Sequence, residues 1–256
     1  MINLKLSYSE LISPLPIKVQ GVGGILSVKL IDIYVLGIDI YYYYLTVLSL
    51  NLKKYFSLIV QNEEEYEKLS EEQKENLTVF KLLISDEDTI MLLQNVLNFF
   101  IQEDVIWSDQ YHCFLVHKNN EIIGTISNEN YLQVCNLISQ RNCFKSDVEE
   151  DLSKIKSKKA LEIMKKLQKG RAEKAKATKT DKNMELGNII SAVANKSHSL
   201  NILNIWNITI FQLWDSFSRQ TNNNIYDINS MSVAAWGNKD NHFDANAWFK
   251  RIDNAN

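Results

Sequence analysis

Chain breakers are scarce in this sequence, and their scarcity narrows the possible folds more than any other feature. Eight glycines and two prolines are spread over 256 residues, and both prolines, Pro14 and Pro16, lie near the beginning. A fold of many short strands needs frequent turns, so this composition favours long helices over a β-sandwich. The hydrophobic content of 45% and the charged content of 23% are ordinary for a globular protein of one or two domains. The sequence therefore predicts a predominantly helical α+β fold.

The amino-terminal third combines a short strand pattern with helix patterns. Residues 15–20 alternate as a strand does, and the glycine-rich residues 21–24 predict a turn. Helices are expected at residues 25–34 and 38–50. A strand interpretation of this region stays open, because isoleucine, valine and tyrosine also favour strands.

A strong helix signal begins near Ser85. This residue is the expected N-cap, because acidic residues in the following turn suit the positive end of the helix dipole. The apolar residues that follow have helical spacing and predict a buried stripe of Ile90, Leu93, Leu97 and Phe100.

A hairpin followed by a helix is expected next. Residues 111–117 and 122–126 read as two strands joined by a polar turn. Ser127 is the expected cap of a helix whose buried face is formed by Tyr131, Val134, Cys135 and Ile138. Because a two-stranded hairpin is marginally stable alone, we expect it to pack on the helices or to gain a third strand, with residues 15–26 as the candidate.

The charge distribution changes sharply after this helix. Residues 151–182 contain twelve basic and four acidic residues, a net charge of +8, whereas the remaining 16 basic and 27 acidic residues give −11. We predict an amino-terminal domain at 1–148, a basic flexible linker or exposed helix at 149–183, and a helical module at 184–256.

The basic segment has three possible roles, namely solvated linker, contact with an acidic protein, or nucleic-acid binding. The candidate contact residues are Lys158, Lys159, Lys165, Lys166 and Arg171. Nucleic-acid binding is the less favoured role, because the segment has no aromatic residues to stack on bases.

No pattern in the sequence indicates catalysis, a metal site or a cofactor. Cys113, Cys135 and Cys143 have irregular spacing, and the glycine-rich turn lacks the spacing of a phosphate-binding loop. Three cysteines without a disulfide framework fit a reducing cytoplasm, and the amino terminus lacks the layout of a signal peptide. The longest strongly apolar uncharged run, residues 40–52, is shorter than the ~20 residues of a membrane helix, so no membrane association is expected.

Residues 204–256 concentrate the tryptophans, with four of the chain's five at Trp206, Trp214, Trp236 and Trp248. Trp206, Trp214 and Phe217 share one helical face with neighbouring apolar residues, which predicts a helix packed on the core. We expect Asn222 to Asn224 to interrupt this helix. A second short helix, 226–236, is then expected to end at a left-handed Gly237, and Asp244 to cap a final helical stub at 245–252.

This much aromatic surface predicts a protein partner as well as a core. Trp236, Trp248 and Phe249 lie near polar breaks in the sequence, where aromatic residues can act as surface anchors. The candidate partner-binding set is completed by Trp214 and Phe217, for which the core interpretation is favoured.

The aromatic pattern resembles the end of a known family. The sequence Ile205-Trp206-Asn207-Ile208-Thr209-Ile210-Phe211-Gln212-Leu213-Trp214-Asp215, followed by Tyr226-Asp227, Ala234-Ala235-Trp236-Gly237, Phe243-Asp244 and Trp248-Phe249-Lys250, is similar to tail assembly chaperones. These proteins belong to tailed phages of Gram-positive bacteria, especially large contractile-tailed phages. The similarity is best over about the last 70 residues.

The resemblance implies a chaperone that binds the tape-measure or tail-tube protein during tail assembly. Such a protein would act in the host cytoplasm and be absent from the mature virion, with self-association possible. The alternatives are a structural protein of the tail or baseplate and, less favoured, a nucleic-acid-binding protein that acts through the basic segment.

Overall fold

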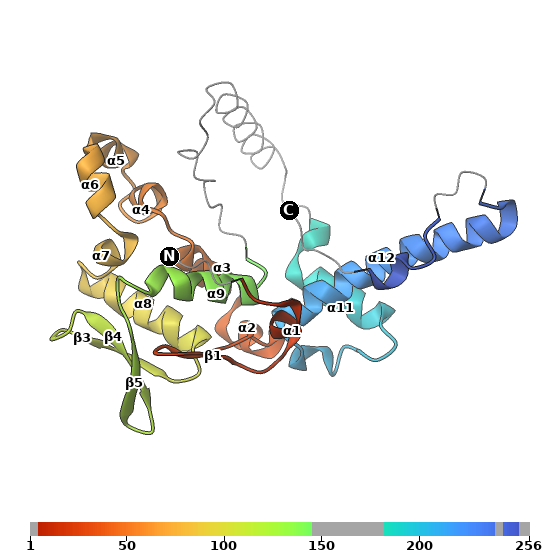
Figure 1. Cartoon of the computed structure of the whole chain (residues 1–256), viewed down its shortest axis with the longest axis horizontal. Coiled ribbons are helices and arrows are strands. Elements are labelled where there is room, and N and C mark those ends of the chain that lie inside the picture. The colour runs from red at the N-terminus through yellow and green to blue at the C-terminus, as the bar shows by residue number, and fades with distance from the viewer. Residues whose placement is uncertain (1–4, 145–181, 239–242, 251–256) are drawn as a thin grey trace. The chain divides into compact units, whose positions relative to one another are not determined.

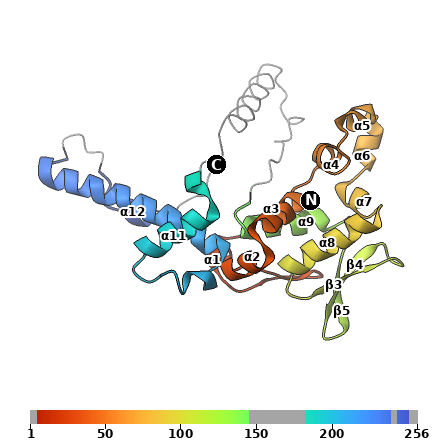
Figure 2. The same cartoon turned by 180° about the vertical axis from the view of Figure 1, so that it is seen from behind.

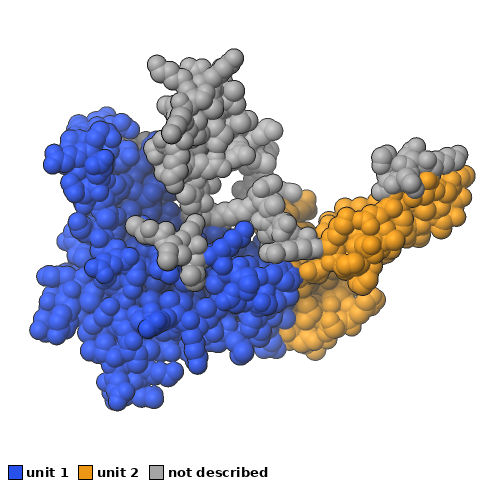
Figure 3. Space-filling model, viewed as in Figure 1, with its two compact units in different colours: residues 1–146, 206–214 blue, residues 147–205, 215–256 orange. Residues whose placement is uncertain are grey.

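The computed structural model describes residues 5–144, 182–238 and 243–250 (Figure 1). Helices dominate these residues, and the described strands form two small antiparallel sheets. The predicted fold class, α+β and predominantly helical, is therefore confirmed. The chain divides into two compact units (Figure 3): unit 1 contains residues 1–146 and 206–214, and unit 2 contains residues 147–205 and 215–256. The predicted domain boundaries at 148 and 184 stay a prediction.

Most of the described helices belong to unit 1, and several are shorter than two turns. They are α1 (Tyr8–Ile12), α2 (Leu30–Leu36), α3 (Ile38–Leu48), α4 (Leu52–Leu58), α5 (Glu63–Lys68), α6 (Glu71–Asn76), α7 (Val79–Leu83), α8 (Glu87–Phe100) and α9 (Tyr131–Arg141). The helix expected at 25–34 begins later than predicted, because Ile25 is the last residue of a strand.

The strands of unit 1 form two separate sheets. β1 (Ile17–Val19) and β2 (Gly23–Ile25) form an antiparallel pair, which confirms the strand and turn expected at residues 15–24. β3 (Asp104–Ser108), β4 (Cys113–Lys118) and β5 (Glu121–Ile126) form a three-stranded antiparallel sheet in that order. The predicted hairpin is confirmed, but its third strand is β3 and not residues 15–26, because β3 reaches β4 through a short connection.

The β1–β2 turn nevertheless touches β5 through the backbone. The Thr125 amide donates to the Gly21 carbonyl oxygen at 2.8 Å. A Cβ atom added to Gly124 would lie 2.1 Å from that same oxygen. Only glycine fits at position 124, because no side-chain carbon tolerates so short a distance to a backbone atom.

Helix α8 lies beside β3 and carries much of the core of unit 1 (Figures 1 and 2). Three of the four predicted stripe residues, Leu93, Leu97 and Phe100, are fully buried, and Ile90 is half-buried. The predicted N-cap is wrong by one residue. The Ser85 hydroxyl donates to the Leu82 carbonyl oxygen instead, and the Asp86 carboxylate accepts the Thr89 amide at 3.1 Å.

The buried face of α9 is as predicted, whereas its beginning is not. The side chains of Tyr131, Val134, Cys135 and Ile138 are all buried. The residue that precedes the helix is Asn130 and not Ser127. The Asn130 carboxamide accepts the Ser127 amide at 2.9 Å, and this bond closes a turn before the first helical residue.

Helices α2 and α3 are joined by Gly37, whose φ of 99° allows a sharp bend between them. Among the described residues no single helix is long and apolar enough to cross a membrane. The pair of α2 and α3, bent by 98° at the break, is long and apolar enough when the two helices are taken together, by length and composition only. Part of their apolar surface lies in the core of unit 1, including Leu30, Ile33 and Leu45.

Two features join distant segments within unit 1. Residues 206–214 return to α2, where the Leu30 amide donates to the Ile208 carbonyl and the Ile210 amide donates to the Val28 carbonyl. The fully buried Arg141 donates from its guanidinium to the carbonyl oxygens of Glu10 and Leu15. The amino-terminal segment is thereby fixed to the end of α9.

The described part of unit 2 consists mainly of helices. The α-helices are α11 (Leu186–Lys196) and most of α12 (Ile210–Trp236). Two short 3₁₀ turns, η2 (Lys182–Met184) and η4 (Ala247–Phe249), lie before α11 and after α12 in the sequence. A further 3₁₀ turn, η3 (Ile205–Asn207), spans the boundary between the units in the sequence.

The interruption predicted at Asn222 to Asn224 is wrong, because α12 continues without a break to Trp236. Asparagine costs only a few tenths of a kcal/mol, up to about 0.7, relative to alanine in a helix, and neither glycine nor proline occurs there. The predicted end is confirmed: Gly237 has a φ of 79°, and its amide donates to the Val233 carbonyl at 2.8 Å.

Candidate functional site

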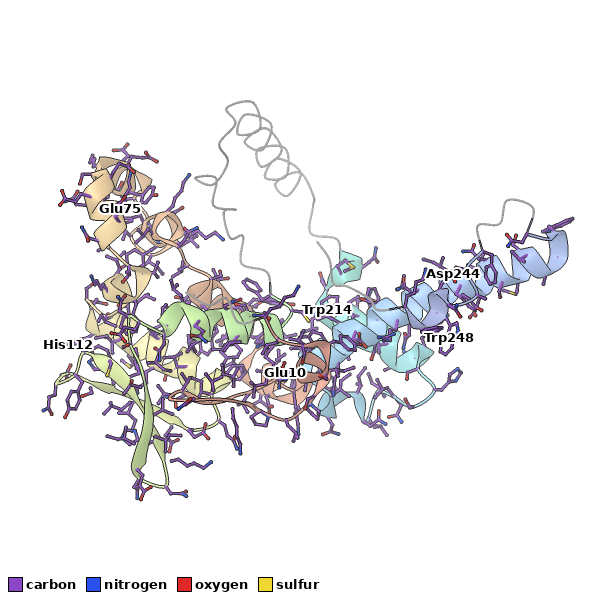
Figure 4. All side chains as sticks on the ribbon, viewed as in Figure 1. Glu10, Glu75, His112, Trp214, Asp244 and Trp248 are labelled. Carbon is purple, nitrogen blue, oxygen red and sulfur yellow. The ribbon has the colours of Figure 1, made fainter. Side chains whose placement is uncertain are left out.

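The part of α12 from Asn222 onward and the segment that follows it form the candidate site. Gly237 ends the helix in a left-handed conformation that only glycine adopts without strain. The described residues after 242 lie beside the helix (Figure 4). The rings of Tyr226 and Phe243 lie 5.5 Å apart, and the Tyr226 hydroxyl donates to the Ala245 carbonyl oxygen at 3.3 Å. These two contacts attach the returning segment to α12.

An ion pair closes the returning segment. The Lys250 ammonium contacts the Asp244 carboxylate, which also accepts the Asn246 amide at 2.9 Å. The hydrogen bond from Lys250, followed by that from Asn246, lowers the pKa of Asp244 below its ordinary value. Asp244 is thus a turn residue and not the cap of a helix at 245–252. The described helical residues there are only the three of η4, preceded by Asn246, and residues 251–252 lie outside the described part.

A groove of about 650 Å³ lies between α12 and the returning segment. Its walls combine apolar rings with carboxamides, and all of its lining residues belong to unit 2. The lining residues are Asn222, Ile225, Tyr226, Asn229, Ser232, Val233, Trp236, Gly237, Asn238, Phe243, Asp244, Ala247 and Lys250.

The structure separates the five predicted partner-binding residues into two sets. Trp236 lines the groove and is 78% exposed. Trp248 and Phe249 are each 55% exposed and lie on η4, between the lining residues Ala247 and Lys250. Their two rings are 5.1 Å apart. In contrast, Trp214 and Phe217 are half-buried near the beginning of α12, before the groove residues begin (Figure 4).

Sequence reasoning missed the carboxamides of the groove. Asn222 was interpreted as part of a helix break, and Asn229 was given no role. The spacing from Asn222 through Tyr226, Asn229 and Val233 to Trp236 repeats as four, three, four and three, which places all five on one helical face. This repeat can be read from the sequence, and it indicates that the two carboxamides share a helical face with the aromatic residues.

The basic candidate residues Lys158, Lys159, Lys165, Lys166 and Arg171 lie outside the described residues. Among the residues that the structure does describe, no group of three or more histidine, cysteine or acidic side chains is placed to hold a metal ion.

A buried thiol in unit 1 is not suited to nucleophilic chemistry. Burial raises the pKa of Cys135 to about 12, despite an opposing hydrogen bond with Tyr131. Because the thiolate is the reactive form of cysteine, this side chain stays protonated and inert near neutral pH.

Comparison with known proteins gives one match, and it covers the candidate site. Residues 176–253 match the family model described as the second domain of YomV, a phage-derived protein family. No curated protein matches the chain, and no solved structure matches it. The matched region includes Trp236, Trp248 and Phe249, and the match indicates that the protein is of phage origin.

Proposed function

We propose that this protein is a non-catalytic tail assembly chaperone, which binds the tape-measure or tail-tube protein of its phage in the host cytoplasm. The observation that carries the proposal is the aromatic surface of Trp236, Trp248 and Phe249. These side chains are 55–78% exposed at the end of a helical unit of phage origin. The resemblance of the same residues to tail assembly chaperones gives the surface its expected partner.

The physical basis is the unfavourable free energy of leaving these aromatic side chains exposed to water. Large aromatic side chains dominate the energetics of interfaces, and a few such residues provide most of the binding free energy. Ile225, Ile228 and Met231 on α12 add apolar side chains that are 53–64% exposed. Exposed apolar side chains gathered in one part of a molecule mark an interaction site, so a transiently exposed apolar segment of a tail protein is a suitable ligand.

The experiment is an affinity pull-down of the tagged full chain from phage-infected cells, analysed by mass spectrometry together with purified virions. We expect the tape-measure or tail-tube protein to be captured and the chaperone to be absent from virions. Stoichiometric presence in virions would instead support a structural tail or baseplate protein. Recovery of nuclease-sensitive nucleic acid without a tail protein would support the basic segment as the functional region.

A paired variant tests the aromatic surface. Trp248→Ala with Phe249→Ala should weaken capture at least tenfold, because truncation of an aromatic hot-spot residue costs about 2 kcal/mol or more. The matched control is Tyr111→Ala with Leu203→Ala, which removes apolar side chains that are 62% and 84% exposed elsewhere. Unchanged capture by the first pair, or an equal loss with both pairs, would contradict the assignment.

A further inference from the structure

The floor of the groove is one face of α12, on which carboxamides alternate with apolar side chains. Asn222, Tyr226, Asn229, Val233 and Trp236 follow one another along this face and all line the groove. The two asparagines therefore point into the same groove, and aromatic or aliphatic side chains lie between and beyond them.

The two carboxamides are available to a ligand. Asn222 and Asn229 are exposed, and neither side chain forms a hydrogen bond with another residue of the described part of the chain. Each carboxamide offers two N–H donors and one carbonyl acceptor, which match the carbonyl and amide groups of a peptide backbone. An uncovered peptide backbone is therefore the chemistry that this face of α12 recognises.

The charged side chains among the described lining residues of the groove are paired with each other. Of those residues Asp244 and Lys250 carry the charges, and they form an ion pair. A charged side chain that entered the groove would lose hydration without gaining an opposite charge. Electrostatic complementarity thus favours a segment without charged residues.

The spacing of the carboxamides selects the conformation of the segment. Asn222 and Asn229 are two helical turns apart, about 10.5 Å along the axis. A polyproline II helix presents the same face every three residues, about 9.3 Å, whereas a β-strand does so every ~6.6 or ~13 Å. An α-helical ligand would already use its own backbone groups internally.

The aromatic side chains support the same conformation. Grooves lined by aromatic rings bind polyproline II segments, which lose little conformational entropy on binding and have a fully exposed backbone. Trp236, Tyr226 and Phe243 supply such rings, and the contact between Tyr226 and Phe243 fixes two of them in place.

We propose that this groove binds an uncharged peptide segment in the polyproline II conformation, with Asn222 and Asn229 hydrogen-bonded to its backbone. The inference deepens the proposed function and rests on it only for the source of the segment, which would be the tape-measure or tail-tube protein.

The test measures binding of fluorescein-labelled peptides to the full chain by fluorescence polarisation. The probes are decaproline, an uncharged glycine-serine decapeptide, and 15-residue peptides tiled across the tape-measure and tail-tube proteins of the same phage. We expect saturable binding of decaproline and of uncharged proline-containing tiles, and none of the glycine-serine peptide. No saturable binding of decaproline, or equal binding of both decapeptides, would overturn the inference.

A matched pair of variants assigns the binding to the groove. Asn222→Ala with Asn229→Ala should weaken binding roughly tenfold or more, since two hydrogen bonds are lost. Asn223→Ala with Asn224→Ala makes the same chemical change on the same helix outside the groove lining and should stay within about twofold of the parent protein. Equal losses in the two variants would overturn the inference, and circular dichroism melts would verify that both fold.

Failure of the inference and failure of the proposed function have different signatures. If decaproline binds through Asn222 and Asn229 but no tail protein is captured from infected cells, the groove inference stands and the chaperone proposal fails. If the Asn222→Ala, Asn229→Ala variant captures the tape-measure protein equally well and also binds decaproline as the parent protein does, the groove inference is overturned and the chaperone proposal stands.

Discussion

The aromatic residues in the core of unit 1 and those at the end of unit 2 are chemically alike but placed in opposite environments. Phe100, Phe114 and Tyr131 are at most 1% exposed. Trp236 and Trp248 are 78% and 55% exposed. The burial of the first set contributes to folding, because apolar surface has been removed from water. The second set retains most of that free energy for a partner, so one residue class stabilises the fold in one unit and is available for recognition in the other.

The largest expected effect comes from emptying the core of unit 1. Phe100→Ala should lower the free energy of unfolding by about 3–5 kcal/mol, because it removes a fully buried ring and leaves a cavity. Trp236→Ala should change it by less than about 0.5 kcal/mol, since that side chain is mostly exposed. Urea denaturation followed by circular dichroism measures both values. Similar decreases in the free energy of unfolding of the two variants would contradict the difference between the two units.

A smaller effect is expected at the buried guanidinium of unit 1. Arg141→Met keeps much of the side-chain volume but leaves the Glu10 and Leu15 carbonyl oxygens without their donors. We expect a loss of about 2–3 kcal/mol, the typical cost of unsatisfied buried acceptors. Urea denaturation measures the loss, and amide hydrogen exchange should show faster exchange in residues 7–16. A fully stable variant would show that the guanidinium contributes little beyond packing.

The smallest effect concerns the ion pair in unit 2. The folded state lowers the pKa of Asp244, so the carboxylate's contribution is present above the ordinary value of 3.8 and is lost as the pH falls through the lower folded value. We expect the segment 243–250 to exchange its amides faster below that pH, with unit 1 unaffected. Asp244→Asn should remove this pH dependence, and a transition that persists in the variant would assign it to another group.

Much of the fold followed from periodicity, and the differences have local physical causes. The stripe of α8 and the face of α9 were predictable because apolar spacing reports burial directly. The N-cap and the third strand were not, because each depended on a competition between neighbouring groups. At helix α8 the cap is the carboxylate of Asp86 and not the hydroxyl of Ser85. In the sheet, β4 has β3 on one side and β5 on the other, so neither of its edges is free for residues 15–26.

The candidate site was predictable in its aromatic part only. Trp236, Trp248 and Phe249 were identified as surface anchors from their position near polar breaks, and all three are exposed. The groove was not foreseen, since Asn222 to Asn224 read as the end of a helix. Three adjacent asparagines resemble a turn in sequence, although their combined propensity cost is too small to end a helix of 27 residues.

Because residues 206–214 belong to unit 1, the folding of unit 1 can be completed only late in synthesis. The backbone bonds between Leu30 and Ile208 and between Val28 and Ile210 join positions about 180 residues apart in the sequence. A growing chain therefore cannot complete unit 1 when residue 146 is made and must wait until residue 214 has left the ribosome. Until then α2 lacks its backbone partners, and the protein that we propose as a chaperone passes through its own interval of incomplete folding.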